Sequence, residues 1–166
     1  MHINRKGIKE LIEEKDLITN YTDLDRQITP NGFDLTVKSV EKIVEKGSID
    51  FTNEERVIPE TKELETKDGW WDLGKGVYKI TMNEIVDIPN NIVGYAYTRS
   101  SLLRMGCHIQ NGFWEAGYNG ETKCLLVVEN PKGMRLKKGG RVLQLAFQEI
   151  DAVEEGYKGI YSSKKS

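Results

Sequence analysis

The chain has 166 residues, of which 30% are charged, with both signs mixed along the sequence and a formal net charge of −2. This composition provides no basic face for nucleic acid, so a small molecule is the expected ligand. Apolar runs such as CLLVV are too short to span a bilayer, and residues 1–20 are charged rather than signal-like. We therefore expect a soluble, cytoplasmic protein with no membrane partner.

Cysteines and histidines are scarce. The chain has two of each, Cys107 and Cys124, His2 and His108. These are too few for a disulfide framework, and they do not form a convincing zinc site. Deamination at a protein-bound zinc ion is therefore disfavoured, and no metal-ligating side chain is predicted.

The first predicted element is a short amphipathic helix that ends near Lys15. Ile8, Leu11 and Ile12 recur at helical spacing after Asn4, which is a suitable N-cap residue.

From residue 31 onward the apolar pattern has a period of two, which is typical of strands. Phe33, Leu35 and Val37 alternate with polar side chains, and residues 78–82 repeat the pattern. Turn signals rich in Gly, Pro and Asn separate segments of strand length. The pattern predicts a mainly β fold, either a barrel or a double sheet.

No domain boundary interrupts the sequence, so residues 1–166 are predicted to form a single domain. The charge-rich residues 51–67 are expected to form a long excursion or β-arm. Residues 155–166 are polar and contain glycine, which predicts a C-terminal tail that is flexible without ligand and able to close over a site.

Phosphate-binding groups follow the apolar run that ends near residue 98. Arg99, Ser100 and Ser101 place a guanidinium group and two hydroxyls where a strand ends, and a helical turn that starts there directs free backbone N–H groups at the same anion. The alternative is a helix N-cap followed by core leucines.

A loop with glycines at positions 112, 117 and 120 follows. It carries one acid, Glu115, and one aromatic residue, Tyr118. Glycines permit close approach of the backbone to a ligand. Together with Arg99 and the serines, this loop indicates a nucleotide site.

Four segments, in order, resemble the motifs of the trimeric dUTPase and dCTP deaminase superfamily. They are NGFDLTV at 31–37, RSSLLR at 99–104, GFWEAGYNG at 112–120 and GGRVLQLAF at 139–147. The opening helix is similar as well, so the resemblance covers nearly the whole chain. AYTRSSLLRMG and the spacing from residue 120 to residue 130 look like the archaeal-type dUTPase branch.

The resemblance implies a distorted, jelly-roll-like β-barrel of the dUTPase-like fold with a short N-terminal helix. It also implies a homotrimer with sites at subunit interfaces, a small deoxynucleoside triphosphate as ligand, and Mg²⁺ bound mainly through the triphosphate.

The same resemblance implies roles for individual side chains. Glu115, which stands where relatives have Asp, is the expected general base for the attacking water, and Asp34 is the second catalytic candidate. Arg99, Ser100, Ser101 and Gln144 would bind phosphate. Gln110, Asn111 and Gly112 would form the turn that addresses the pyrimidine, and Tyr118 would pack on the deoxyribose.

Several of these positions have plainer interpretations. Asp34 is equally consistent with a strand-face aspartate paired with a lysine, and Gln144 with a buried glutamine bonded to backbone. Arg104 and Tyr161 are secondary site candidates. Arg104 matches a position of the deaminase-type motif, with an intersubunit or structural ion pair as its plainer interpretation, and Tyr161 is a candidate for stacking on the base. Lys164 or Lys165 is a weak candidate for contact with the terminal phosphate.

Hydrolysis of dUTP to dUMP and pyrophosphate, by in-line attack of an activated water on the α-phosphorus, is the expected activity. A dCTP deaminase, metal-free or bifunctional, is the first alternative, but the resemblance implies a catalytic glutamate in the strand after the loop, and Glu129 is out of register for it. The second alternative is a non-catalytic or regulatory nucleotide-binding relative, because Glu115 replaces the shorter Asp.

Overall fold

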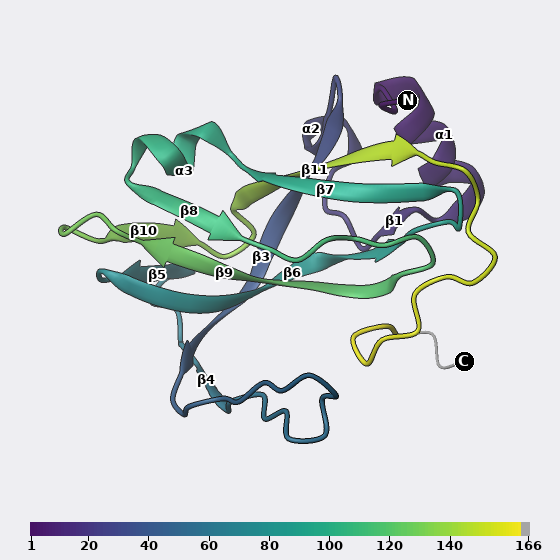
Figure 1. Ribbon diagram of the computed structural model, residues 1–166. Helices are drawn as coiled ribbons and strands as arrows, with labels where there is room; N and C mark the ends of the chain where they lie inside the picture. Colours follow the sequence, from purple (N-terminus) through teal and green to yellow (C-terminus); the bar gives the residue numbers. More distant parts are fainter. Residues whose placement is uncertain (164–166) are drawn as a thin grey trace.

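The chain forms a nearly closed antiparallel barrel with a short helix near its N-terminus, in a computed structural model that describes residues 1–163 (Figure 1). Lys164 and Lys165 lie outside the described residues. The elements in chain order are α1 (Arg5–Lys15), β1 (Ile18–Thr19), α2 (Leu24–Gln27), β2 (Ile28–Thr29), β3 (Gly32–Ile43), β4 (Thr61–Glu63), β5 (Trp70–Leu73), β6 (Gly76–Asp87), β7 (Ile92–Thr98), α3 (Ser100–Arg104), β8 (Cys107–Gln110), β9 (Asn119–Val128), β10 (Met134–Lys137) and β11 (Arg141–Glu149). The predicted mainly β, barrel-like fold with a short N-terminal helix is confirmed.

The main sheet has the strand order β7-β11-β3-β6-β9-β8, and a separate ribbon pairs β10 with β5. The end strands β7 and β8 meet at Thr98. Its hydroxyl donates a hydrogen bond to the Ile109 carbonyl (3.2 Å) and accepts one from the Ile109 amide (2.9 Å). A side chain therefore bridges the two ends of the sheet, next to the residue that begins the predicted phosphate site.

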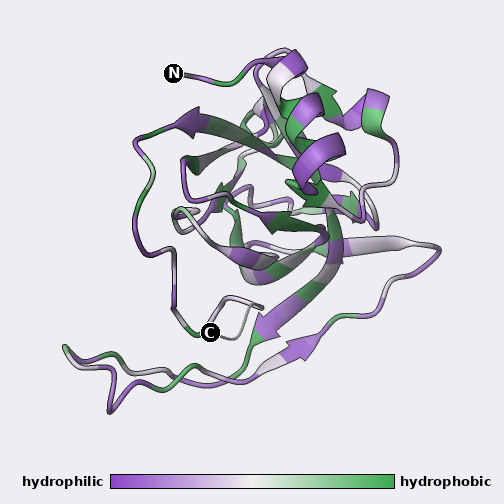
Figure 2. Ribbon diagram, turned by 90° about the vertical axis from the view of Figure 1, so that its right-hand side faces the viewer, coloured by the Kyte–Doolittle hydropathy of each residue, from purple (hydrophilic) through white to green (hydrophobic). Residues whose placement is uncertain are grey.

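The core follows the alternation seen in the sequence. Phe33, Leu35 and Val37 on β3 are fully buried, as are Leu145 and Phe147 on β11. Figure 2 shows the hydrophobic stretches concentrated in the strands of the barrel. The polar residues between them, Asp34 and Thr36, are buried too, because α2 lies against that side of β3. The period of two in the sequence does not predict this burial.

Helix α1 begins where the sequence predicts it. The side chain of Asn4 accepts a hydrogen bond from the Gly7 amide at 3.1 Å, and Ile8 and Ile12 are buried. Asp16 ends the helix in the left-handed conformation. Among residues 1–163, no helix is both long and apolar enough to cross a membrane.

Two irregular segments extend from the barrel. Residues 44–60 leave β3 and return through β4, which pairs with the end of β3, so an arm is present but begins seven residues before the predicted excursion of residues 51–67 (Figure 1). The tail after β11 runs back along the barrel, where the Val153 amide bonds to the Asn90 carbonyl and the Tyr157 amide to the Ala116 carbonyl. It thus lies against the glycine-rich loop of its own chain, and its flexibility stays a prediction.

Leu35→Ala is expected to lower the free energy of unfolding by about 2–5 kcal/mol, because it leaves a cavity at a fully buried position. Lys6→Ala, on the exposed side of α1, is the matched control and should change it by less than about 0.5 kcal/mol. Urea denaturation measures both, and equal effects would contradict the assignment of the core.

Candidate functional site

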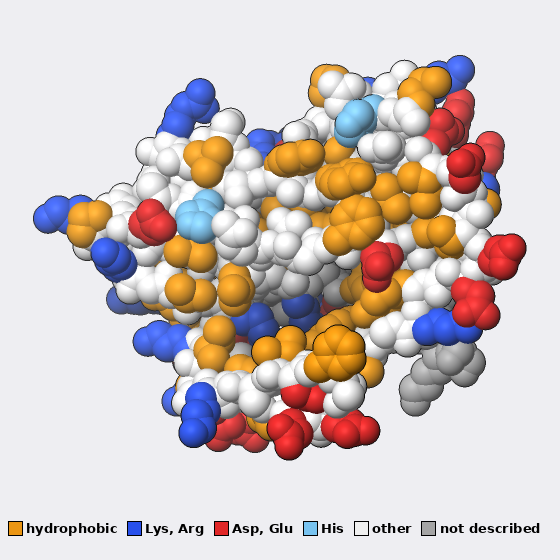
Figure 3. All heavy atoms as spheres, viewed as in Figure 1, with side chains coloured by type: hydrophobic (Ala, Val, Ile, Leu, Met, Phe, Trp, Pro, Cys, Tyr) orange, Lys and Arg blue, Asp and Glu red, His pale blue; other side chains and the backbone are white. Residues whose placement is uncertain are grey.

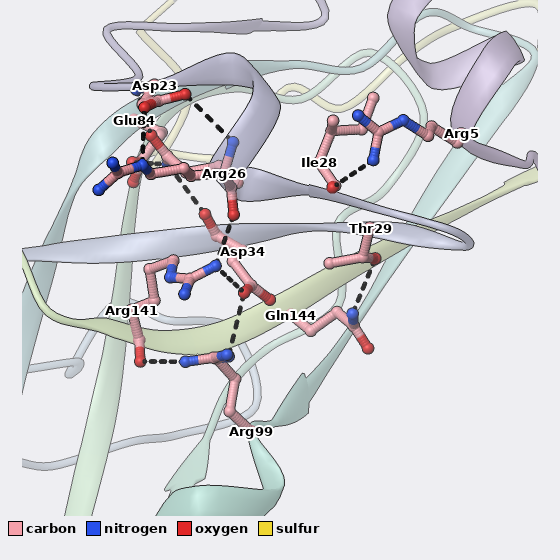
Figure 4. A network of polar contacts seen from close by, with 11 residues as sticks. Arg5, Asp23, Arg26, Ile28, Thr29, Asp34, Glu84, Arg99, Arg141 and Gln144 are labelled. Atoms are coloured by element: carbon pink, nitrogen blue, oxygen red, sulfur yellow. Dashed lines mark hydrogen bonds and ion pairs between the residues drawn. The ribbon is translucent and has the colours of Figure 1, made fainter.

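Asp34 on β3, Arg141 on β11 and Arg99, which follows β7 and caps α3, form a charged cluster named here the arginine cluster. Asp34 Oδ2 lies 3.1 Å from Arg99 Nε and 3.3 Å from Arg141 Nη1, and Arg99 also donates to the Arg141 carbonyl (Figure 4). The partner of Asp34 is therefore arginine, where sequence had also allowed a lysine. Two cations on one carboxylate leave a net positive charge at the surface, suited to an anion.

The pKa of Asp34 reflects two opposing effects. The residue is only 2% exposed, and burial raises its pKa above the ordinary value of 3.8 because desolvation outweighs the attraction of Arg99 and Arg141. Burial of the carboxylate is therefore costly even with both guanidinium groups beside it.

Gln144 is brought to the same place by strand pairing. It lies directly opposite Asp34 on β3 and Tyr97 on β7, and its side-chain amide donates to the Thr29 hydroxyl at 2.9 Å. Residues directly opposite each other in a sheet share a face. The structure thus brings together three residues that were predicted from separate motifs: Asp34, Arg99 and Gln144. The hydrogen-bond partner of Gln144 is a side-chain hydroxyl and not a backbone group.

Helix α3 begins next to the arginine cluster. Ser100 and Ser101 are its first two residues and are exposed, so their hydroxyl groups are accessible to solvent. The backbone N–H groups at the start of a helix have no acceptor within the helix. Arg104 at the helix end is exposed and makes no ion pair within residues 1–163, so the structural ion pair considered for it is not present there. Arg99 Nη2 likewise has no hydrogen-bond partner in that range.

The glycine-rich loop, residues 111–120, carries Glu115 and Tyr118. Trp114 is buried and its backbone pairs with Gly94 on β7, where an added Cβ would lie 2.9 Å from the Trp114 Cβ. The neighbouring Glu115 is exposed. Gly117 has a φ of 81°, and it packs against Gly156 of the tail. The loop therefore presents its carboxylate to solvent while Trp114 anchors it to the barrel.

Tyr118 lies at the end of this loop, partly covered by the tail. Its hydroxyl donates to the Glu121 carbonyl at 2.9 Å, and its ring meets Tyr157 edge-on at 5.6 Å. Burial raises the pKa of Tyr118 to about 12, so the hydroxyl stays protonated at neutral pH. Tyr161 of the tail is exposed, and its carbonyl lies close to Gly120.

The proposed pyrimidine turn connects β8 to the glycine-rich loop. Gln110 is exposed and its amide lies 3.1 Å from His108 Nδ1, whereas the Asn111 amide donates to the Gly112 carbonyl. The two parts of the site are far apart in one chain. Arg99 follows the last residue of β7 and stands five residues from Gly94, so at about 3.3 Å per residue its backbone is roughly 16 Å from the point where Trp114 anchors the Glu115 loop.

Three residues of the charged region were not predicted. Arg141 stands three positions before Gln144 in the fourth motif, a spacing that predicts opposite faces in a regular strand, and the register shift between Arg141 and Leu143 brings it to the same side. Gln27 and Glu84 gave no signal in the sequence, because the four-residue helix α2 and an irregular stretch of β6 bring them beside β3.

No group of three or more His, Cys, Asp or Glu side chains within residues 1–163 is arranged to hold a metal ion. The two candidate carboxylates do not converge either, because Asp34 belongs to the arginine cluster and Glu115 stands alone on its loop.

The family model and the curated relatives that match this sequence belong to the same group of nucleotide enzymes. The dCTP deaminase-like family matches residues 3–150. A Methanosarcina mazei protein named "Probable deoxyuridine 5′-triphosphate nucleotidohydrolase" is 45% identical over 99% of this chain and 98% of its own length. A Methanocaldococcus jannaschii protein named "Deoxyuridine 5′-triphosphate nucleotidohydrolase" is 38% identical over 84% of this chain and 90% of its own.

Solved structures share the fold. The dCTP deaminase of Agrobacterium tumefaciens superposes with a TM-score of 0.67 at 20% identity, covering 89% of this chain and 48% of that one. The EIAV dUTPase gives a TM-score of 0.52 at 16% identity, with coverages of 83% and 91%.

The raised pKa of Asp34 predicts the direction of a pH effect. Between the ordinary value of 3.8 and the raised pKa, the folded chain binds more protons than the unfolded chain, so the free energy of unfolding should fall as pH rises. Asp34→Asn removes this contribution. Urea denaturation of both proteins between about pH 4 and 7 measures the difference, and a wild-type stability that instead rises relative to the variant would show that the arginines dominate.

Proposed function

This chain belongs to the dCTP deaminase-like family, and we propose that it acts within that family as a dUTP diphosphatase, hydrolysing dUTP to dUMP and pyrophosphate. The observation that carries the proposal is the arginine cluster beside α3, an anion site in a chain whose curated relatives are named for dUTP hydrolysis.

The position of Glu129 favours hydrolysis over deamination. It follows the last residue of β9, its side chain is 69% exposed, and its carboxylate lies 3.5 Å from His108 Nε2. A glutamate that shuttles protons to a base needs to lie within the site. The strand positions before it, residues 124–128, are all apolar.

In the proposed reaction, a water molecule attacks the α-phosphorus. The Glu115 carboxylate orients this water and takes its proton, while the bond from the α-phosphorus to the bridging oxygen breaks and pyrophosphate leaves with the electron pair. Arg99, with Nη2 available, and the serine hydroxyls of α3 stabilise the charge on the phosphate oxygens. Gln144 is a neutral donor nearby.

Magnesium would enter with the substrate. Because the candidate carboxylates do not converge within residues 1–163, the ion would be held chiefly by phosphate oxygens and water, with the exposed Glu115 carboxylate available to its water ligands. The ion would neutralise charge on the triphosphate.

The complete site would form between subunits of a homotrimer. Arg99 and the anchor of the Glu115 loop lie at opposite ends of β7, and contacts between subunits would bring an arginine of one copy and a glutamate of another to one triphosphate. Large apolar side chains are also exposed on the face formed by β7, α3, β8 and β9, where Figure 3 shows hydrophobic atoms gathered: Tyr97, Leu103, Met105, Phe113 and Leu125. Contact between copies would cover this surface.

The activity assay compares dUTP and dCTP with Mg²⁺. Purified protein should release pyrophosphate from dUTP, and Glu115→Gln should lower kcat at least a hundredfold, which is the size of a general-base contribution. Glu115→Asp keeps the carboxylate and should retain more activity than Glu115→Gln. Conversion of dCTP to dUTP would instead assign a deaminase, and tight binding of dUTP without turnover would assign a regulatory binder.

Mixed trimers test the shared site. Arg99→Ala and Glu115→Gln chains, each inactive alone, are denatured together in equal amounts and refolded. If each site takes its arginine from one subunit and its glutamate from another, random assembly restores about a quarter of the wild-type sites. No recovery of dUTP hydrolysis would place both residues of a site in one chain, and sedimentation as a monomer would exclude the trimer.

A further inference from the structure

Glu84 is a fully buried carboxylate to which the proposed reaction assigns no role. It lies on β6 with 0% exposure and makes no ion pair within residues 1–163. Three neutral donors hold it: Gln27 Nε2 and Thr36 Oγ1, each at 2.7 Å from Oε1, and the Thr36 amide at 2.9 Å from Oε2. A buried carboxylate bound only by neutral donors is costly, so its retention calls for a reason.

An irregularity in β6 turns Glu84 toward β3. Thr81 pairs with Lys123 of β9 and Ile85 pairs with Glu121, so four steps along β6 face two steps along β9. Such extra residues bend a strand and redirect its side chains. Glu84 stands in this stretch, and its carboxylate reaches Thr36, two residues along β3 from Asp34.

The amide of Gln27 connects Glu84 to Asp34. Its nitrogen donates to Glu84 and also to the Asp34 carbonyl, at 2.9 Å. Its oxygen accepts the amides of Thr22 (2.8 Å) and Asp23 (3.0 Å). With both ends of the amide occupied, only one orientation satisfies all four contacts, and Glu84 is one of the two acceptors that fix it.

A second connection runs through α2 to Arg141. Gln27 is the last residue of this helix, and the carbonyl of Arg26, just before it, accepts a hydrogen bond from Arg141 Nη1. The same nitrogen contacts Asp34. Figure 4 shows Glu84 and Arg26 on one side of Asp34, with Arg99 and Arg141 on the other. Both the backbone of Asp34 and one guanidinium of the arginine cluster are thus tied to Glu84.

We propose that Glu84 is a positioning residue for nucleotide binding: its carboxylate fixes Gln27 and α2, so that Asp34 and Arg141 hold Arg99 at the orientation that receives a phosphate. This rests on the proposed function for the identity of the nucleotide. The contacts themselves are present in the single chain without ligand.

Glu84→Gln tests this proposal with almost no change in shape. In either orientation the new amide group faces a donor, either the Thr36 amide or the Gln27 nitrogen, so one contact becomes repulsive. The KM for dUTP should rise about tenfold, equivalent to the loss of one hydrogen bond to a charged group, while kcat changes by less than about threefold. Gln27→Met, which removes the connecting amide and leaves Glu84 bonded to Thr36, should raise KM in the same direction.

Ile80→Val is the matched control, because it shortens a fully buried side chain on the same strand without touching the network. It should lower the melting temperature and leave KM unchanged. If Glu84→Gln behaves like Ile80→Val, with lower stability and the wild-type KM, the positioning role is wrong.

A measurement without nucleotide separates this proposal from the proposed function. The NMR signal of the Arg99 Nε–H group, assigned by its loss in Arg99→Lys, reports the ion pair with Asp34. It should exchange slowly with solvent in the wild type and in Ile80→Val, and rapidly in Glu84→Gln and Gln27→Met. Slow exchange in both network variants would overturn the positioning role, whereas absence of dUTP hydrolysis by the wild type would overturn only the function.

Discussion

Burial of the Asp34 carboxylate between β3 and β11 is the constraint on which the rest of the site depends. Removing a carboxylate from water is costly, and its raised pKa shows that two arginines only partly offset that cost. The arginines in turn are held by backbone carbonyls, of Arg141 for one and of Arg26 for the other. A single buried charge therefore determines where two guanidinium groups lie and how α2 sits against the barrel.

The two halves of the site are built by different means. The arginine cluster is held by strand pairing, with a register shift between Arg141 and Leu143, and by a buried polar network within one chain. The Glu115 loop is irregular, is attached to β7 through Trp114, and is overlaid by the tail of its own chain. A rigid anion-binding half and a more adjustable half that carries the reactive carboxylate would bind phosphate first and position the water afterwards.

Much of this arrangement could be predicted from the sequence. The features that could not be predicted depend on contacts that leave no pattern in the sequence. The alternation at Phe33, Leu35 and Val37 predicted which side chains form the core, and Asn4 predicted where the first helix begins. Motif order placed Asp34, Arg99 and Gln144 together. Glu84 gave no signal, because a glutamate in a strand is normally exposed and its burial depends on an irregular pairing. The position of the Glu115 loop was hidden too, because it depends on an isolated bridge between Trp114 and Gly94 that no sequence pattern indicates.

The Thr98 hydroxyl, which joins the two ends of the sheet, has a thermodynamic consequence. Arg99 follows it directly, so the closing contact of the barrel and the guanidinium beside Asp34 belong to adjacent residues. An anion that binds more tightly to Arg99 in the closed barrel than in the open one would shift the opening equilibrium toward closure, by linkage. Closure of the sheet and occupation of the phosphate site would then be thermodynamically coupled.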